Sequence, residues 1–313
     1  MLRFAILTSV CRCSSVGNRA VLNHQVSELD TSGDRVSPDV TSVAAADRGL
    51  PILMYHSLDS SGSVVSVAPR DFAATMVALA QLGYRGITLR EAVTHRQAKG
   101  TWPDRCVVLT FDDGYANFHE AALPILARHG FAATVFLVSG HVGGQNDWEP
   151  PLAQLGVCPM LSWGQVGELS AAGMEIGAHT KTHPDLAQLS PRAAQDEIVA
   201  SRAEIEEHMG RRVESFAYPY GSLSGVARQI VAREFQAACT TVLKRADREP
   251  LHELPRIEMH YIRSRRTLER LLNGELDRYL AVRRWGRVMR QTLRSTRRAQ
   301  KTITTSLAEP ARD

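Results

Sequence analysis

Short apolar runs alternate with amphipathic segments from residue 50 to residue 243. Runs of four to six apolar or β-branched residues are typical of buried strands, whereas apolar residues three or four apart indicate helices on a core. The pattern predicts strands at 51–56, 86–89, 107–111, 133–138, 175–178, 215–218 and 237–242, and helices at 71–82, 117–128, 163–172, 190–209 and 225–234. Such alternation implies parallel strands with crossover helices, in a barrel or a doubly wound sheet.

Capping residues support the predicted helix limits. Ser190 suits the N-cap of the longest helix, Pro191 suits its first position, and Gly210 follows its end. In the same way, Asp71 is the expected cap of an earlier helix and Gly83 its expected stop.

The two ends of the chain differ from the middle. Residues 1–48 form a leader that is polar from residue 14 onward, without a stable period, and we expect it to be disordered. The main folded domain is expected at 49–262, followed by a basic helical extension at 263–313. Within that extension, residues 267 to about 306 predict one or two helices in which Leu, Tyr, Trp and Val alternate with arginines.

Charge separates the extension from the rest of the chain. The formal net charge is only +4, yet thirteen basic residues lie between Arg263 and Lys301. This pattern fits a solvated helix that packs on the domain, or contact with an anionic lipid or polymer. Nucleic acid is the disfavoured partner, because no recognisable reading module accompanies the charge.

Cysteine usage and the N-terminus say less about the compartment. The five cysteines show no CxxC pair, so neither a disulfide framework nor a thiolate zinc site is expected. The apolar run at residues 4–10 is short for a signal peptide and lacks a small-residue cleavage site. We therefore favour a cytoplasmic location, or a peripheral one at the inner membrane, over export.

Two adjacent carboxylates follow one predicted strand. The strand 107–111 leads directly to Asp112 and Asp113, and Gly114 marks a turn. Active residues in α/β folds gather at the carboxyl ends of strands, so these two are candidates for chemistry. Taken alone, an acidic pair before glycine is as well explained by a turn or a helix cap.

Two histidines follow another predicted strand. His179 and His183 lie four residues apart after strand 175–178, and Pro184 favours a loop over a helix. With Asp113 they would offer two nitrogens and one carboxylate oxygen, a set that suits a catalytic divalent ion of the zinc type. Without Asp113, the two histidines would be equally consistent with hydrogen-bonded loop residues.

Together these motifs resemble the polysaccharide deacetylases of carbohydrate esterase family four, which share the NodB homology domain. The resemblance rests on residues 110–114 (Thr-Phe-Asp-Asp-Gly), 179–183 (His-Thr-Lys-Thr-His), 216–221, 52–56 and 254–257, which occur in the family's order. It implies that 49–262 is a distorted TIM-like (β/α) barrel with fewer than eight regular units. It also implies metal-dependent hydrolysis of N-acetyl groups on N-acetylhexosamine units of a polysaccharide or oligosaccharide.

The resemblance also implies residue roles. Asp113, His179 and His183 would hold the metal, most simply zinc, with cobalt, nickel or manganese as alternatives. Asp112 would be the general base, and the backbone N–H of Tyr220 would stabilise the oxyanion.

The sequence departs from the family pattern at two places. Ala217 stands where the family often has an arginine that orients the base, and Arg256 is the expected replacement. No clean copy of the family's general-acid histidine motif is present, so His260 is our choice, with His252 and His56 as competitors. These departures leave two alternatives open: a deformylase or deacylase of a lipid-linked amino sugar, and a glycan-binding pseudoenzyme.

Overall fold

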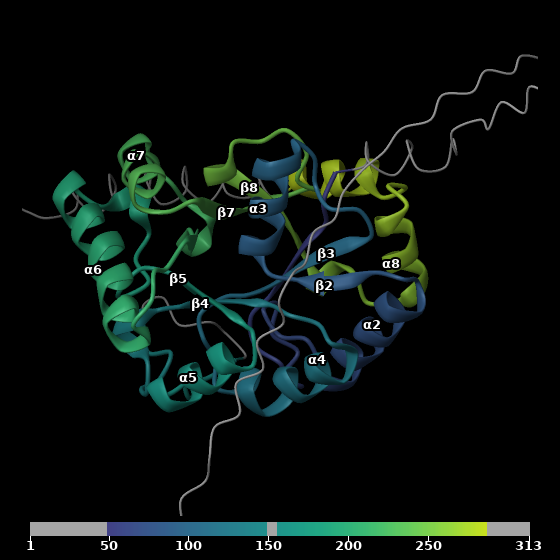
Figure 1. The fold of residues 1–313 in the computed structure, drawn as a ribbon, viewed down its shortest axis with the longest axis horizontal. Helices are drawn as coiled ribbons and strands as arrows, with labels where there is room; N and C mark the ends of the chain where they lie inside the picture. Colours follow the sequence, from purple (N-terminus) through teal and green to yellow (C-terminus); the bar gives the residue numbers. More distant parts are fainter. Residues whose placement is uncertain (1–48, 149–154, 287–313) are drawn as a thin grey trace, which may run out of the picture. The chain divides into compact units, whose positions relative to one another are not determined.

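The computed structural model describes residues 49–148 and 155–286. The predictions for residues 1–48 and for the part of the extension beyond residue 286 lie outside these residues. The centre of the fold is a closed ring of parallel strands (Figure 1). The ring consists of β1 (Ile52–Tyr55), β3 (Cys106–Phe111), β4 (Thr134–Leu137), β5 (Glu175–Ala178), β6 (Ser215–Ala217), β7 (Ala237–Leu243) and β8 (Leu254–Glu258).

The first strand closes the ring. β1 pairs with β3 on one side and with β8 on the other. The eighth strand, β2 (Arg85–Ile87), pairs only with the first half of β3, on the edge where β4 pairs with the second half. β2 therefore extends the sheet without entering the ring. The predicted barrel of fewer than eight regular units is confirmed.

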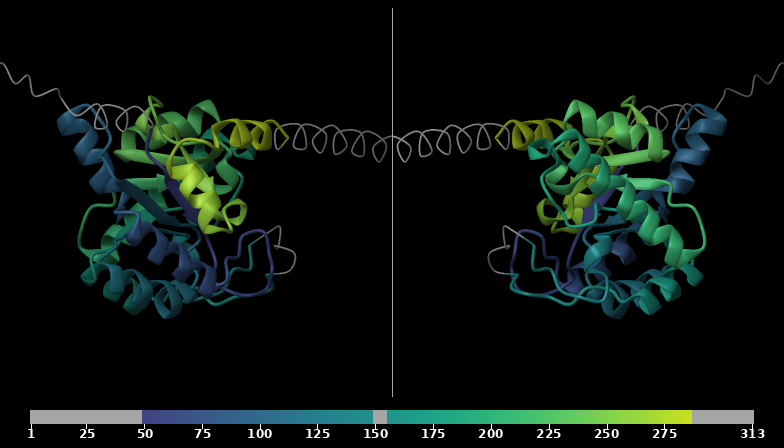
Figure 2. Two further views of the ribbon diagram at one scale, coloured as in Figure 1. Left: turned by 90° about the vertical axis from the view of Figure 1, so that its right-hand side faces the viewer. Right: turned by 90° about the vertical axis from the view of Figure 1, so that its left-hand side faces the viewer.

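Helices cover the outside of the barrel (Figures 1 and 2). They are α2 (Pro69–Gln81), α3 (Leu89–Lys99), α4 (Leu123–His129), α5 (Trp163–Ala171), α6 (Pro191–Met209), α7 (Gly225–Glu234) and α8 (Arg265–Leu272), with a π-helical turn at Phe118–Ala122 before α4. Short 3-10 turns occur at Ser139–His141, Leu186–Gln188, Pro219–Gly221, Leu251–Glu253 and Met259–Tyr261. The main apolar core lies between strands and helices, and Phe72, Phe111 and Phe118 are fully buried in it.

Most predicted elements are confirmed, but the helix α3 and the strand β8 were not predicted. The predicted limits of α6 and α7 match the structure, including the Ser190 cap, which accepts a hydrogen bond from the Ala193 N–H. The segment from Leu89, however, is the helix α3, whose only buried residues are Leu89, Ala92 and Val93. The helix α2 begins at Pro69, and Asp71 lies in its first turn instead of capping it.

The described part of the extension contains α8, a turn, and a further helical segment at 277–286. Leu276 and Leu280 are 3% and 1% exposed, so this segment is packed on the domain through one face. In the two described ranges, no helix combines the length and apolar character that crossing a bilayer requires.

Candidate metal centre

Asp112 and Asp113 lie where β3 ends. The Asp112 N–H still donates to the Tyr55 carbonyl oxygen at 2.9 Å, so Asp112 keeps the strand pairing. The backbone then turns, because Asp113 adopts a φ of 74° and Gly114 a φ of 86°. The side chains of adjacent strand residues point to opposite faces, and this turn removes that constraint. Both carboxylates are buried, at 3% and 4% exposure.

Asp113, His179 and His183 converge on one point. One ligand atom from each lies within 4.8 Å of the others, and all three residues are buried. The Nε2 atoms of His179 and His183 both lie 3.4 Å from Asp113 Oδ1. The structure therefore brings together the three residues that the sequence predicted as metal ligands.

The hydrogen bonds of the two rings fit a metal ion. His179 Nδ1 lies 2.7 Å from the Ala217 carbonyl oxygen, which can only accept, so Nδ1 carries a proton. In a neutral ring, Nε2 then presents its lone pair to the Asp113 carboxylate, an arrangement that a cation between them would stabilise. His183 Nδ1 similarly lies 3.1 Å from the Tyr220 hydroxyl, which leaves Nε2 facing Asp113. These three residues would hold the ion.

The protonation states also suit metal binding. Burial raises the pKa of Asp113, but its interactions with His179 and His183 outweigh burial, and the net pKa lies well below the usual range. Burial lowers the pKa of His183 to about 3, so this ring is neutral at physiological pH. A carboxylate and a neutral imidazole are the forms that bind metal.

Asp112 has a different partner. Arg256 on β8 donates two hydrogen bonds to it, from Nη1 to Oδ1 at 2.6 Å and from Nη2 to Oδ2 at 2.7 Å. Burial raises the pKa of Asp112, but the Arg256 charge outweighs it and lowers the pKa overall. Arg256, which is 0% exposed, thus lies opposite Asp112, as predicted from the sequence.

Two further predicted residues lie at the site. The Tyr220 hydroxyl contacts His183, and its backbone has a φ of 59° within the turn Pro219–Gly221. His56, directly after β1, places Nε2 3.9 Å from Asp112 Oδ2, and its side chain is 17% exposed. His56 is therefore close to the carboxylate and has access to solvent.

His260 has a different environment. Its Nδ1 lies 2.8 Å from Arg263 Nη2, and no contact between His260 and Asp112, Asp113, His179 or His183 is found within the described residues. His260 instead lines a separate surface pocket with Asp59, Ser66 and Arg70. The general-acid role predicted for His260 is therefore not supported by proximity to the carboxylates. The sequence does not indicate the direction of the turn after β8, so it could not reveal this.

The backbone between the two histidines is held from α6. Glu197 accepts hydrogen bonds from the N–H groups of Lys181 and Thr182, both at 2.9 Å, and from the Thr182 hydroxyl at 2.7 Å. Thr180 and His183 have positive φ angles of 66° and 61°. Such non-glycine conformations cost free energy and persist only where surrounding contacts fix them.

Two aromatic residues at the site were not assigned roles from the sequence alone. The Tyr115 hydroxyl accepts a hydrogen bond from Asn146 Nδ2 at 3.5 Å, and burial together with the nearby Asp113 charge raises the pKa of Tyr115 well above the usual value. The Trp148 ring lies 4.8 Å from the His183 ring and is 8% exposed. Tyr115 directly follows the acidic motif and Gly114, and that adjacency was the available signal. Residues 149–154, which follow Trp148, lie outside the described residues.

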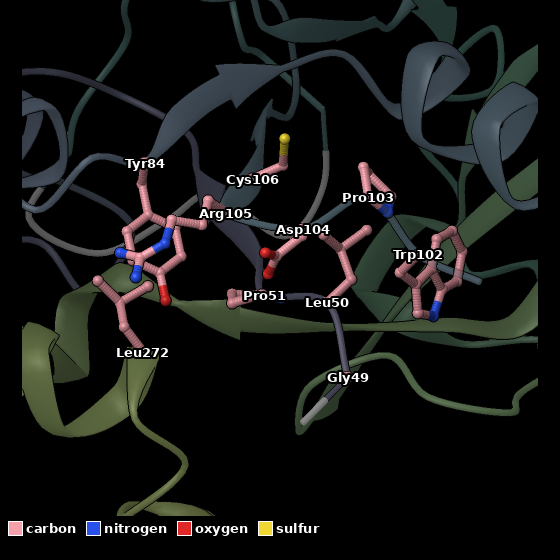
Figure 3. Close-up of a pocket in the computed structure, with 10 residues that line it drawn as sticks. All are labelled: Gly49, Leu50, Pro51, Tyr84, Trp102, Pro103, Asp104, Arg105, Cys106 and Leu272. Atoms are coloured by element: carbon pink, nitrogen blue, oxygen red, sulfur yellow. The ribbon is translucent and has the colours of Figure 1, made fainter. Parts of the chain in front are cut away.

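A pocket at the opposite end of the barrel is not a second substrate site. It is lined by Leu50, Tyr84, Trp102 and Cys106, among others, near the amino ends of β1, β2 and β3 (Figure 3). Its volume is about 50 Å³, which is enough for one or two water molecules. The motif residues all lie at the carboxyl ends.

Comparison with known proteins agrees with this geometry. Residues 99–235 match the family model for polysaccharide deacetylase. The chain is 31% identical over 172 residues to YxkH of Bacillus subtilis (strain 168), a protein provisionally named a polysaccharide deacetylase, and the match covers 55% of this chain and 57% of YxkH. It is 29% identical over 171 residues to the poly-β-1,6-N-acetyl-D-glucosamine N-deacetylase of Staphylococcus aureus (strain MSSA476), covering 51% and 55%. The chain thus spans just over half of the length of these curated relatives.

The fold comparison covers more of the chain. The Streptococcus pyogenes deacetylase PplD, solved in complex with acetate, superimposes with a TM-score of 0.63 at 26% identity. The match covers 72% of this chain and 98% of PplD. A closed parallel barrel with the acidic and histidine motifs at its carboxyl end accompanies these matches, and the chain is similar in sequence and fold to the polysaccharide deacetylases.

Proposed function

We propose that this protein is a metal-dependent carbohydrate N-deacetylase that hydrolyses N-acetyl groups on N-acetylhexosamine units of a polysaccharide or oligosaccharide. The observation that carries the proposal is the division between two adjacent carboxylates. Asp113 faces His179 and His183, whereas Asp112 is held by Arg256. One carboxylate can therefore bind the ion while its neighbour stays free to accept a proton.

A divalent ion at this site would lower the pKa of a water molecule and polarise the amide oxygen. Asp112 is ionised at neutral pH, because Arg256 lowers its pKa, so it can take the proton of the attacking water. The water oxygen bonds to the carbonyl carbon, and the carbon–nitrogen bond then breaks to give acetate and an amine. The Tyr220 N–H is our candidate for the donor that stabilises the charge on the carbonyl oxygen during attack.

The departing amine needs a proton, because an amide anion is a poor leaving group. Our first choice from the sequence, His260, contacts Arg263 and lies apart from the carboxylates. His56 lies 3.9 Å from Asp112 and is partly exposed. We therefore propose His56 as the general acid in place of His260.

The identity of the sugar substrate is also a proposal. The Staphylococcus aureus relative is named for a β-1,6-linked polymer of N-acetylglucosamine, so this polymer is the first substrate to test. Tyr220, which is 42% exposed beside His183, offers a ring on which a sugar could stack.

The test is acetate release from poly-β-1,6-N-acetylglucosamine, chitooligosaccharides and a formylated amino sugar. The protein is assayed as purified, after chelation, and after zinc or cobalt is restored. We expect release that chelation abolishes and metal restores. Formate release without acetate release would identify a deformylase instead, and no release by metal-loaded protein from any substrate would support the pseudoenzyme.

Two variants test the assigned roles. Asp112→Asn should keep the bound metal and lose turnover, because its amide cannot accept the proton. His179→Ala should lose both. Metal content measured on the two purified proteins separates these cases, and an empty metal site in Asp112→Asn would refute the division of labour.

A further inference from the structure

The helical segment 277–286 is fixed to the domain through one side only. Leu276 and Leu280 are buried, and Arg245 Nη2 donates to Asp277 Oδ2 at 2.7 Å. Arg245 is itself only 9% exposed, so this ion pair anchors the start of the segment. In Figure 2 the segment points away from the barrel. Its position is thus determined at its first turn, while its far side is left open.

The open side carries large apolar residues. Val282 is 70% exposed and Trp285 is 69% exposed, the two highest values among the large hydrophobic residues of the described ranges. Arg278, Val282 and Trp285 are spaced by four and three residues, so they share the helix face opposite Leu280. In the sequence, Met289 and Leu293 continue this spacing. An exposed tryptophan and valine on one helix face indicate that another surface binds there.

Apart from Asp277, which pairs with Arg245, the charged residues of this segment are all positive. Arg278, Arg283 and Arg284 are exposed, and no ion pair is found for any of them in residues 49–148 and 155–286. Arg283 packs over the rings of Tyr261 and Tyr279, at 5.0 and 5.2 Å. The sequence then adds six basic residues between positions 287 and 301 and no acidic one.

We propose that this face binds the surface of an anionic lipid bilayer, with Val282 and Trp285 in the interface and the arginines at the headgroups. An anionic polymer would match the charges but would leave the apolar side chains in water. A second copy of the chain could cover them, but symmetric pairing would bring like charges together. A bilayer satisfies both features, because tryptophan favours its interface and basic residues favour anionic headgroups. The peripheral membrane location expected from the sequence would follow.

The test is co-sedimentation of the full chain with vesicles. One set of vesicles contains phosphatidylcholine only. In the second set, part of the phosphatidylcholine is replaced by phosphatidylglycerol. We expect binding to the anionic vesicles that falls as salt rises, with binding to the neutral ones weaker by roughly tenfold or more. Trp285→Ser with Val282→Ser should weaken binding to anionic vesicles by a similar factor, roughly tenfold. Deacetylase activity on soluble substrate should not change.

Matched controls separate this surface from general effects. Val157→Ser removes a similarly exposed valine, at 65%, from a loop outside this segment, and should leave binding unchanged. Arg278→Glu should weaken binding, whereas Arg192→Glu, on α6 and 93% exposed, should not. Undiminished binding by the Val282 and Trp285 variant would overturn the proposal. A dimer that is detected by light scattering and that this variant dissociates would also overturn it. So would displacement of the protein from vesicles by DNA, if that displacement depended on the arginines and not on Val282 and Trp285.

Discussion

Replacing Arg256 with methionine would leave a carboxylate buried without its partner. Arg256 and Asp112 are 0% and 3% exposed and share two hydrogen bonds of 2.6 and 2.7 Å. Arg256 Nε also donates to the Thr240 carbonyl oxygen at 3.0 Å. Removing one member of a buried ion pair typically costs about 3–5 kcal/mol, because the remaining charge stays desolvated. We expect Arg256→Met to lower the free energy of unfolding by about this amount.

The loss should depend on pH with a definite sign. In the wild type the folded-state pKa of Asp112 is lowered, so its contribution to stability is present above its unfolded pKa and is lost as pH falls through the folded value. Without Arg256, burial dominates and raises that pKa. The variant should therefore be closest to the wild type in acid and furthest from it at neutral pH. The acid limb of its residual activity should move to higher pH.

The assay is urea unfolding of four proteins: wild type, Arg256→Met, Asp112→Asn and the double variant. Replacing both partners removes the unpaired charge, so the double variant should be more stable than Arg256→Met. Arg256→Lys keeps the charge but not the two-pronged contact, and should recover stability better than activity. If Arg256→Met lost less than about 1 kcal/mol, or if the double variant were less stable than it, the ion pair would not have the role assigned here.

Three further predictions concern Glu197 and Gly221 near the site and Glu175 at the amino end of β5. Glu197→Ala frees the backbone between the histidines, so zinc affinity in a chelator competition should fall by about 10–100-fold while Glu207→Ala, exposed on the same helix, leaves it unchanged. Gly221→Ala would place a Cβ 2.7 Å from the Thr241 backbone nitrogen at a φ of 68°, and unfolding should show a loss of more than about 1 kcal/mol. Burial raises the pKa of Glu175, so the wild type should lose stability relative to Glu175→Gln as pH rises from about 4 to about 7; a constant difference would contradict this.

The convergence of the three candidate metal ligands could be predicted because it depends on local signals. Asp113 follows a strand of uninterrupted apolar character, and His179 follows another, so both lie at the same end of a parallel barrel. The spacing of His179 and His183 within one loop then brings the second ring close. Parallel topology and loop spacing are both readable from the sequence.

The surroundings of the ligands could not be read in the same way. β8 contains Pro255 and two charged residues, so its sequence lacks the pattern of a buried strand, and only motif resemblance pointed to Arg256. His56 and His260 both follow strand ends, and their roles depend on which way each turn is directed. The contact between Arg256 and Asp112 joins residues that are 144 positions apart. Such long-range contacts are set by packing.

The ring closes where β1 pairs with β8, and this affects both the synthesis of the protein and the choice of fragment boundaries. Residues 99–235, the region matched by the family model, contain all three candidate metal ligands but neither of these strands nor Arg256. During synthesis from the amino end, these three residues leave the ribosome well before the arginine that pairs with Asp112. A recombinant fragment trimmed to the matched region would carry every candidate ligand and still lack the partner of Asp112, so expression boundaries should begin before Ile52 and extend beyond Glu258.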